Sequence, residues 1–242
     1  MGFMMAEKLY NMIQNIPFEK ILFLDIETVP QAGNWSDLDE ATQKLWDKKT
    51  RFQRKEDVSA DEFYEDRGGI MAEFGKIVCI SVGMLAKSGK LKIHSFSGHD
   101  EKKLLEEFGE MFNNPRMNQV VLCAHNGKEF DFPYISRRML INQIQPPVPL
   151  QMFGKKPWEI PHIDTMELWK FGDWKNFVSL ELLAHIFGVP TPKDDIDGSM
   201  VASIYYIEKD LERIRVYCEK DVLTLCNVFR KMRQEDLLQR ED

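Results

Sequence analysis

An apolar run from Ile21 to Thr28 carries two carboxylates near its end. As a β-strand, this run alternates its side chains between two faces, so Asp25 and Glu27 share one face, about 7 Å apart along the strand. Leu24 and Ile26 take the other face. Buried ionised carboxylates need a positive partner, and acidic oxygens at this spacing suit hard cations such as Mg²⁺ or Mn²⁺. A strand that simply ends in a polar loop has the same pattern, so carboxylates further along the chain must decide between the two interpretations.

The next acidic position of interest is Asp131, which follows a second apolar segment at residues 120–124. Gly127 permits a turn, and Pro133 suits the first turn of a helix, so Asp131 is expected at or just before a helix N-terminus. An ordinary N-cap aspartate would fit this position equally well. Asn126, in the same turn, is either a plain turn residue or a hydrogen-bond donor to a substrate.

Tyr217 and Asp221 lie on a long helix that the sequence predicts over residues 210–238. Because they are four residues apart, they share one helical face, about 6 Å apart along the axis. Ile214 and Leu225 are apolar neighbours, which indicates that this face packs inward. A charged aspartate is costly there unless it meets a partner, whereas a lone tyrosine could be ordinary core packing.

Taken together, these positions resemble the three exonuclease motifs of the DEDD superfamily, in its tyrosine-bearing DEDDy branch. The motifs are Asp-x-Glu at the end of a first strand, Asn-x4-Asp with an aromatic before the aspartate, and Tyr-x3-Asp on a late helix. The histidine-bearing branch would have histidine where Val216 stands. The sequence resembles the exonuclease domains of B-family DNA polymerases, and among them free-standing bacterial PolB-like predicted 3′→5′ exonucleases. The resemblance covers residues 21–229, with residues 31–74 expected to be an insertion.

The resemblance implies an α/β ribonuclease H-like fold, in which helices flank a five-stranded mixed sheet, and a single exonuclease domain over residues 1–242. It also implies two divalent cations, Mg²⁺ or Mn²⁺, held by Asp25, Glu27, Asp131 and Asp221. By this resemblance Asp25 bridges both ions, Glu27 and Asp221 complete the first site, and Asp131 serves the second. Tyr217 joins these acids in the catalytic set and orients the attacking water.

The substrate implied by the resemblance is the 3′ end of single-stranded nucleic acid, with DNA favoured. Substrate contacts are expected from Thr28, Asn126, Phe130 and Lys193. Arg137 and Arg138 are further candidates, although a solvent-exposed structural role suits them, and Lys193, at least equally. An RNA-directed exoribonuclease and a non-catalytic nucleic-acid-binding protein on the same fold remain alternatives. A proofreading or repair role would need a polymerase or repair partner, because no polymerase domain fits in the 242 residues.

Composition is ordinary for a soluble globular protein, with 43% hydrophobic and 11% aromatic residues. The net charge of −7 argues against a protein that coats nucleic acid by bulk electrostatics. Four cysteines without zinc-ligand spacing are expected to be buried in a reducing compartment. No apolar run is long enough to span a membrane, and the N-terminus lacks the apolar core of a signal peptide, so a cytoplasmic protein is expected.

Periodicity predicts the remaining elements. A helix is expected over residues 35–55, followed by an irregular stretch over 56–75 and a β-hairpin from strands at 76–86 and 90–96. Helices are expected over 101–112, 180–187 and 199–207, and a short fifth strand over 160–163.

Several charged or ionisable side chains outside the motifs have simpler interpretations. Lys44, Lys48, Arg51 and Lys55 share a face of the first helix, which is either a solvated face or a contact with a phosphate backbone. His125, His162 and His185 are expected to be structural, because no two of them have metal-ligand spacing. Asp164 is expected to cap a helix.

Overall fold

The computed structural model describes residues 13–173, 175–191 and 196–241. Five strands form one mixed sheet in the order β3-β2-β1-β4-β5. β1 pairs antiparallel with β2 and parallel with β4, so it lies at the centre of the sheet. The strands are β1 Ile21–Pro30, β2 Gly75–Leu85, β3 Leu91–Ser97, β4 Val121–Ala124 and β5 Ile163–Asp164. The predicted α/β class, the five-stranded mixed sheet and the hairpin are therefore confirmed.

The fifth strand lies slightly later than predicted. It begins at Ile163 rather than residue 160, and it pairs with β4 through Cys123 and Ala124. The neighbouring amide of β4, that of Leu122, donates to the ring nitrogen of His162 instead of to a strand carbonyl. The backbone ladder therefore starts only after His162.

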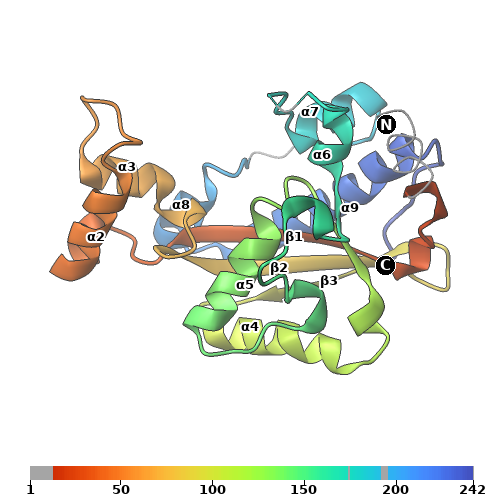
Figure 1. Cartoon of the computed structure of the whole chain (residues 1–242), viewed down its shortest axis with the longest axis horizontal. Helices are drawn as coiled ribbons and strands as arrows, with labels where there is room; N and C mark the ends of the chain where they lie inside the picture. The colour runs from red at the N-terminus through yellow and green to blue at the C-terminus, as the bar shows by residue number, and fades with distance from the viewer. Residues whose placement is uncertain (1–12, 174, 192–195, 242) are drawn as a thin grey trace.

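Helices cover both faces of the sheet (Figure 1). Helices α4 (Glu101–Glu110) and α5 (Asp131–Ile141) pack on one face, and α9 (Leu211–Met232) packs on the other. Successive residues of β1 alternate between these layers. Leu22, Leu24 and Ile26 join the α4–α5 core, whereas Ile21 and Phe23 pack with residues of α9. Asp25 and Glu27 continue the row that faces α9.

The other helices are shorter. α6 (Thr165–Lys170) and α7 (Leu180–Phe187) follow β5, and α8 (Val201–Ser203) continues into a π-helical turn over Ile204–Glu208. The helix predicted over residues 199–207 is therefore split in two. The last helix ends at Met232, earlier than the predicted residue 238, and none of the described helices is long and apolar enough to cross a membrane.

The connection between β1 and β2, residues 31–74, contains two helices, α2 (Glu40–Thr50) and α3 (Ala60–Arg67). The single helix predicted over residues 35–55 is wrong at both ends, because Asp39 caps α2 at its start and Thr50 ends it. The irregular stretch predicted over 56–75 is also wrong, since a capping box at Ser59 begins α3. The two helices enclose a small core of their own, made of Leu38, Trp46, Tyr64 and Phe74.

A buried ion pair joins helix α5 to helix α4 and, through it, to strand β2. Arg138 of α5 donates through Nε to Glu101 of α4 at 2.8 Å, and the same carboxylate accepts the backbone amide of Ile77 in β2. Arg138 also donates to the carbonyl of Ala72. Its guanidinium is thus fully used within the fold, which rules out the predicted alternative of a substrate contact. All four cysteines are free and buried, as expected.

Because the Arg138–Glu101 pair is buried, we expect Glu101→Ala to lower the free energy of unfolding by about 3–5 kcal/mol, the cost of an unpaired buried guanidinium. Urea denaturation measures this change. Glu107→Ala on the exposed side of the same helix is the matched control, and it should change the stability by less than about 0.5 kcal/mol. A loss of under 1 kcal/mol for Glu101→Ala would contradict this role for the pair.

Candidate active site

The short β4 strand leaves part of β1 open. β4 pairs with β1 only as far as Phe23, which lies opposite Cys123. Beyond that point the β1 edge faces the turn that follows β4, and this turn leads into α5. Asp131 is the first residue of α5, as predicted, and its carboxylate is hydrogen-bonded by the backbone amide of Ile26. Asp131 therefore lies directly beside the strand that carries Asp25 and Glu27.

Asp164 holds the turn in place. Its two carboxylate oxygens accept the backbone amides of Asn126 and Lys128 at 3.0 and 3.1 Å, and those of Met166 and Glu167 at 3.0 and 3.2 Å. The last two bonds are the predicted helix cap. The first two were not foreseen, because residues 126 and 164 are far apart in the sequence. Asp164 thus couples the start of α6 to the turn before Asp131.

The backbone conformation of this turn explains the residue types at positions 126 and 127. Asn126 has a positive φ of 60°, a value that asparagine tolerates better than most residues. A Cβ added to Gly127 would lie 2.4 Å from the Cβ of Ala124, so only glycine fits there. These two requirements produce the sharp change of direction from β4 into α5.

Asp25 and Glu27 form a compact group with Cys218 of α9. One ligand atom from each residue lies within 4.8 Å of the others. The Cys218 thiol donates to Oδ2 of Asp25 at 3.3 Å. Burial raises the pKa of Cys218 well above its usual value, so the thiol stays protonated and acts as a donor. The sequence had not indicated Cys218; its position directly after Tyr217 was the only available signal.

Burial and neighbouring acids raise the pKa values of the carboxyl groups in this group. Burial raises the pKa of Asp25 well above its usual range, and the charges of Asp221 and Asp131 raise it further. Burial and the charges of Asp25 and Asp221 do the same to the pKa of Glu27. Burial raises the pKa of Asp131 to about 8. Within the described residues, no salt bridge pairs Asp25, Glu27 or Asp131 with a cationic side chain.

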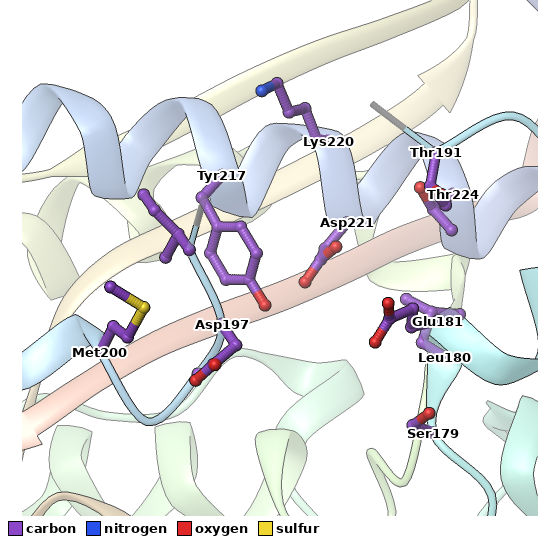
Figure 2. A pocket seen from close by; sticks show the side chains of 12 residues that line it. Ser179, Leu180, Glu181, Thr191, Asp197, Met200, Tyr217, Lys220, Asp221 and Thr224 are labelled. Carbon is purple, nitrogen blue, oxygen red and sulfur yellow. The ribbon is translucent and has the colours of Figure 1, made fainter. Parts of the chain in front are cut away.

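Tyr217 and Asp221 face this group from α9. The Tyr217 hydroxyl is hydrogen-bonded to Asp221, and burial followed by the charge of Asp221 raises the tyrosine pKa far above its usual value. Figure 2 shows the hydroxyl and the carboxylate pointing into the same space. That space is a cavity of about 610 Å³, which also borders Glu181, Asp197 and Lys220. The sequence had not indicated these last three residues.

The remaining predicted contacts lie around the same turn and strand. Thr28 is half-buried at a β-bulge that follows Glu27. Asn126 has a buried Oδ1 that accepts no hydrogen bond within the described part of the chain. Phe130 is half-buried, with its ring centroid 5.3 Å from that of Tyr134. Lys193 lies outside the described residues.

Two histidines near the site have structural roles, as predicted. His125 pairs through its ring nitrogens with the Thr165 hydroxyl at 2.9 Å and the Val178 carbonyl at 2.7 Å. His162 accepts the amide of Leu122 and donates to the carbonyl of Pro149. Neither ring has a nitrogen left over for a ligand.

Replacing one of the crowded acids should stabilise the protein without metal. The folded state raises the pKa of Asp25, so at pH 8 the ionised group destabilises the fold, and this penalty disappears as the pH falls. We expect Asp25→Asn to raise Tm in chelator at pH 8, by about 2–4 °C for each kcal/mol of electrostatic destabilisation that the substitution removes. The increase in Tm should be smaller near pH 5. Differential scanning calorimetry measures both.

With added Mn²⁺, the wild type should have a higher Tm than Asp25→Asn, because binding of the ion stabilises the wild type more than the variant. Asp66→Asn, at an exposed position of α3, is the matched control and should leave Tm unchanged. A lower Tm for Asp25→Asn than for wild type in chelator at pH 8 would contradict the electrostatic account.

Comparison with known proteins supplies the family. The sequence model of a predicted 3′-5′ exonuclease related to the exonuclease domain of PolB matches residues 70–241. This range contains Asp131, Tyr217 and Asp221 and begins after Asp25 and Glu27. A search of curated proteins finds no match.

Among solved structures, the chain is similar to the family B DNA polymerase from the hyperthermophilic archaeon Pyrobaculum calidifontis, with a TM-score of 0.50 and 17% sequence identity. The similarity covers 86% of this chain and 24% of the polymerase, so the chain spans about a quarter of that protein. At this identity the likeness concerns the fold, which is the α/β arrangement of a ribonuclease H-like exonuclease. By its sequence match, the chain belongs to the family of predicted 3′-5′ exonucleases related to the exonuclease domain of PolB.

Proposed function

We propose that this protein hydrolyses phosphodiester bonds from the 3′ end of single-stranded nucleic acid, with DNA as the favoured substrate. The observation that carries this proposal is the convergence of Asp25, Glu27, Asp131 and Asp221, which come from three separate elements and together raise the pKa values of Asp25 and Glu27. Such a cluster destabilises a metal-free fold at neutral pH, so a structural role alone does not account for it. The family description supports the same class of reaction.

The donor set fits two hard divalent cations, Mg²⁺ or Mn²⁺. Its ligands are carboxylate oxygens, which these ions prefer, and the site has excess negative charge that the ions would neutralise. Asp25 would hold both ions, Glu27 and Asp221 would complete one site, and Asp131 would serve the other. When bound, such ions lower the pKa of water and stabilise charge on a transferring phosphoryl group.

Tyr217 has a positioning role in this proposal. Its raised pKa keeps the hydroxyl protonated, so it is unsuited to act as a general base. The hydroxyl oxygen can accept a hydrogen bond from the attacking water, while its proton is held by Asp221. In the reaction the water oxygen bonds to phosphorus and the bond from phosphorus to O3′ breaks. The products are a nucleoside 5′-monophosphate and a strand shortened by one residue.

The terminal nucleotide would occupy the cavity beside Tyr217. Its volume of about 610 Å³ lies within the range of small-molecule sites. Asn126 suits a contact with the nucleotide, because its buried Oδ1 has no partner in the described residues. We place Thr28, Phe130 and Lys193 in the same group of substrate contacts. Aromatic stacking and phosphate contacts of this kind do not depend on base sequence.

A digestion assay tests the proposal. A 5′-labelled single-stranded DNA of about 25 nucleotides and the matching RNA are incubated with the protein in Mn²⁺ or Mg²⁺, and then in chelator. We expect a ladder that shortens from the 3′ end only when metal is present, and faster digestion of DNA than of RNA. Faster digestion of RNA would favour the exoribonuclease alternative, and no digestion of either would favour a non-catalytic binding protein.

Two variants assign the activity to the site. Asp221→Asn should abolish the metal-dependent activity, and Tyr217→Phe should lower kcat by about 10²-fold, the cost of a misplaced reactant, with KM little changed. Asp66→Asn, purified in the same way, is the control for contaminating nucleases and should retain full activity. Residual activity in Asp221→Asn equal to wild type would refute the assignment, provided that circular dichroism shows both proteins folded.

A further inference from the structure

The β1–β2 connection carries a concentrated positive charge. Residues 44–55 contain six lysines and arginines and only one acidic residue, Asp47, although the whole chain has a net charge of −7. Three of these cations lie on α2, together with Leu45, and the other three lie in the segment that directly follows the helix, together with Phe52. We call the surface formed by Lys44, Leu45, Lys48, Lys49, Arg51 and Phe52 the basic face of α2.

The basic face lies on the side of α2 opposite its buried residues. Trp46 and Thr50 are fully buried, and Trp46 donates to the carbonyl of Ala60. At 100° per residue, Lys48 lies directly opposite these two buried residues, with Leu45 beside it, and Arg51 and Phe52 directly follow the end of the helix. The basic face therefore points away from the small core of the connection.

The exposed apolar side chains are the unexpected feature of this face. Leu45 is 61% exposed and Phe52 is 85% exposed. Trp46, rather than either of them, takes the buried position of the helix. A helix face that only interacts with solvent gains nothing from exposed leucine and phenylalanine, whereas a binding face does.

Some of the cations on the basic face form salt bridges within the protein, and others do not. Lys44 pairs with Glu40, and Lys49 pairs with Glu73. Among the described residues, no carboxylate lies within salt-bridge range of Lys48 or Arg51, and the guanidinium of Arg51 lies 4.5 Å from the centroid of the Phe52 ring. Two cations and an aromatic ring are thus presented together to solvent. This combination matches a single strand of nucleic acid, which offers phosphates to cations and bases to aromatic rings.

The position of the connection relates this face to the candidate active site. β1 continues for three residues beyond Glu27 to Pro30, about 10 Å along the strand, and the connection begins there. Figure 1 shows α2 and α3 projecting past this end of the sheet, well separated from α6 and α7. A strand that leaves the site in the direction of Thr28 therefore runs toward the connection.

We propose that the basic face of α2 binds the part of a nucleic-acid strand that lies upstream of its 3′ end. Lys48 and Arg51 contact phosphates, and Phe52 stacks on an unpaired base. This proposal rests on the proposed exonuclease function and adds a second contact region outside the acidic site. It also explains how a chain of net charge −7 can hold a polyanion.

Fluorescence anisotropy with 5′-labelled single-stranded DNA of about 5 and about 25 nucleotides tests the second contact region. The measurement is made in chelator, so that binding does not depend on metal in the acidic site. Lys48→Ala/Arg51→Ala/Phe52→Ala should weaken binding of the long strand by about 10-fold or more, and the ratio of long-strand to short-strand affinity should fall. The slope of log K against log salt should decrease by about 1.4 for the two lost phosphate contacts.

Lys102→Ala/Lys103→Ala is the matched control, because these two exposed lysines lie on α4, against the opposite face of the sheet from α9. It should leave affinity for the long strand unchanged. Unchanged affinity of the triple variant, with Tm equal to wild type, would overturn the proposal.

The binding measurement is independent of catalysis. A protein that fails to digest nucleic acid but binds the long strand through α2 would refute the exonuclease function alone. A protein that digests DNA while the triple variant binds it normally would refute the basic face alone.

Discussion

The burial of Asp25 and Glu27 on the central strand is the constraint to which the rest of the structure responds. Both acids face α9 from a strand that is otherwise apolar, and burial and mutual repulsion raise the pKa values of both. Among the described residues, the Cys218 thiol donates a hydrogen bond to Asp25, and no cationic side chain forms a salt bridge with Asp25 or Glu27. Asp131 and Asp221 add further negative charge instead of relieving it. The fold thus accepts a local loss of stability that a positively charged ligand would remove.

The short length of β4 makes this arrangement possible. A longer β4 would pair with β1 beyond Phe23 and would close the edge that Asp131 occupies. Because the strand ends at Ala124, the chain must turn sharply there. Asp164 supports this turn by accepting the backbone amides of Asn126 and Lys128. The Arg138–Glu101 pair then fixes the helix that begins at Asp131. An ion pair outside the acidic group therefore helps to hold Asp131 in its position beside Asp25 and Glu27.

The distribution of charge divides the molecule into two parts. The acidic residues converge beside the sheet, whereas α2, which carries the basic face, lies beyond its end (Figure 1). The connection can carry this charge because it has its own small core around Trp46 and does not depend on the sheet for burial. A separate core leaves the opposite side of α2 free of packing requirements. Its composition can therefore serve the proposed binding of nucleic acid without disturbing the core.

The sequence by itself determined what depends on local periodicity. Strand alternation put Asp25 and Glu27 on one face, helical spacing did the same for Tyr217 and Asp221, and turn residues put Asp131 at a helix start. The structure bears out each of these placements, while the roles of these residues and of Lys193 stay predictions. Only the tertiary structure decided which residues meet across the chain: Cys218 beside Asp25, Asp164 beneath the Asn126 turn, Trp46 rather than Leu45 turned inward. Such contacts depend on packing between distant segments, and local patterns carry no information about them.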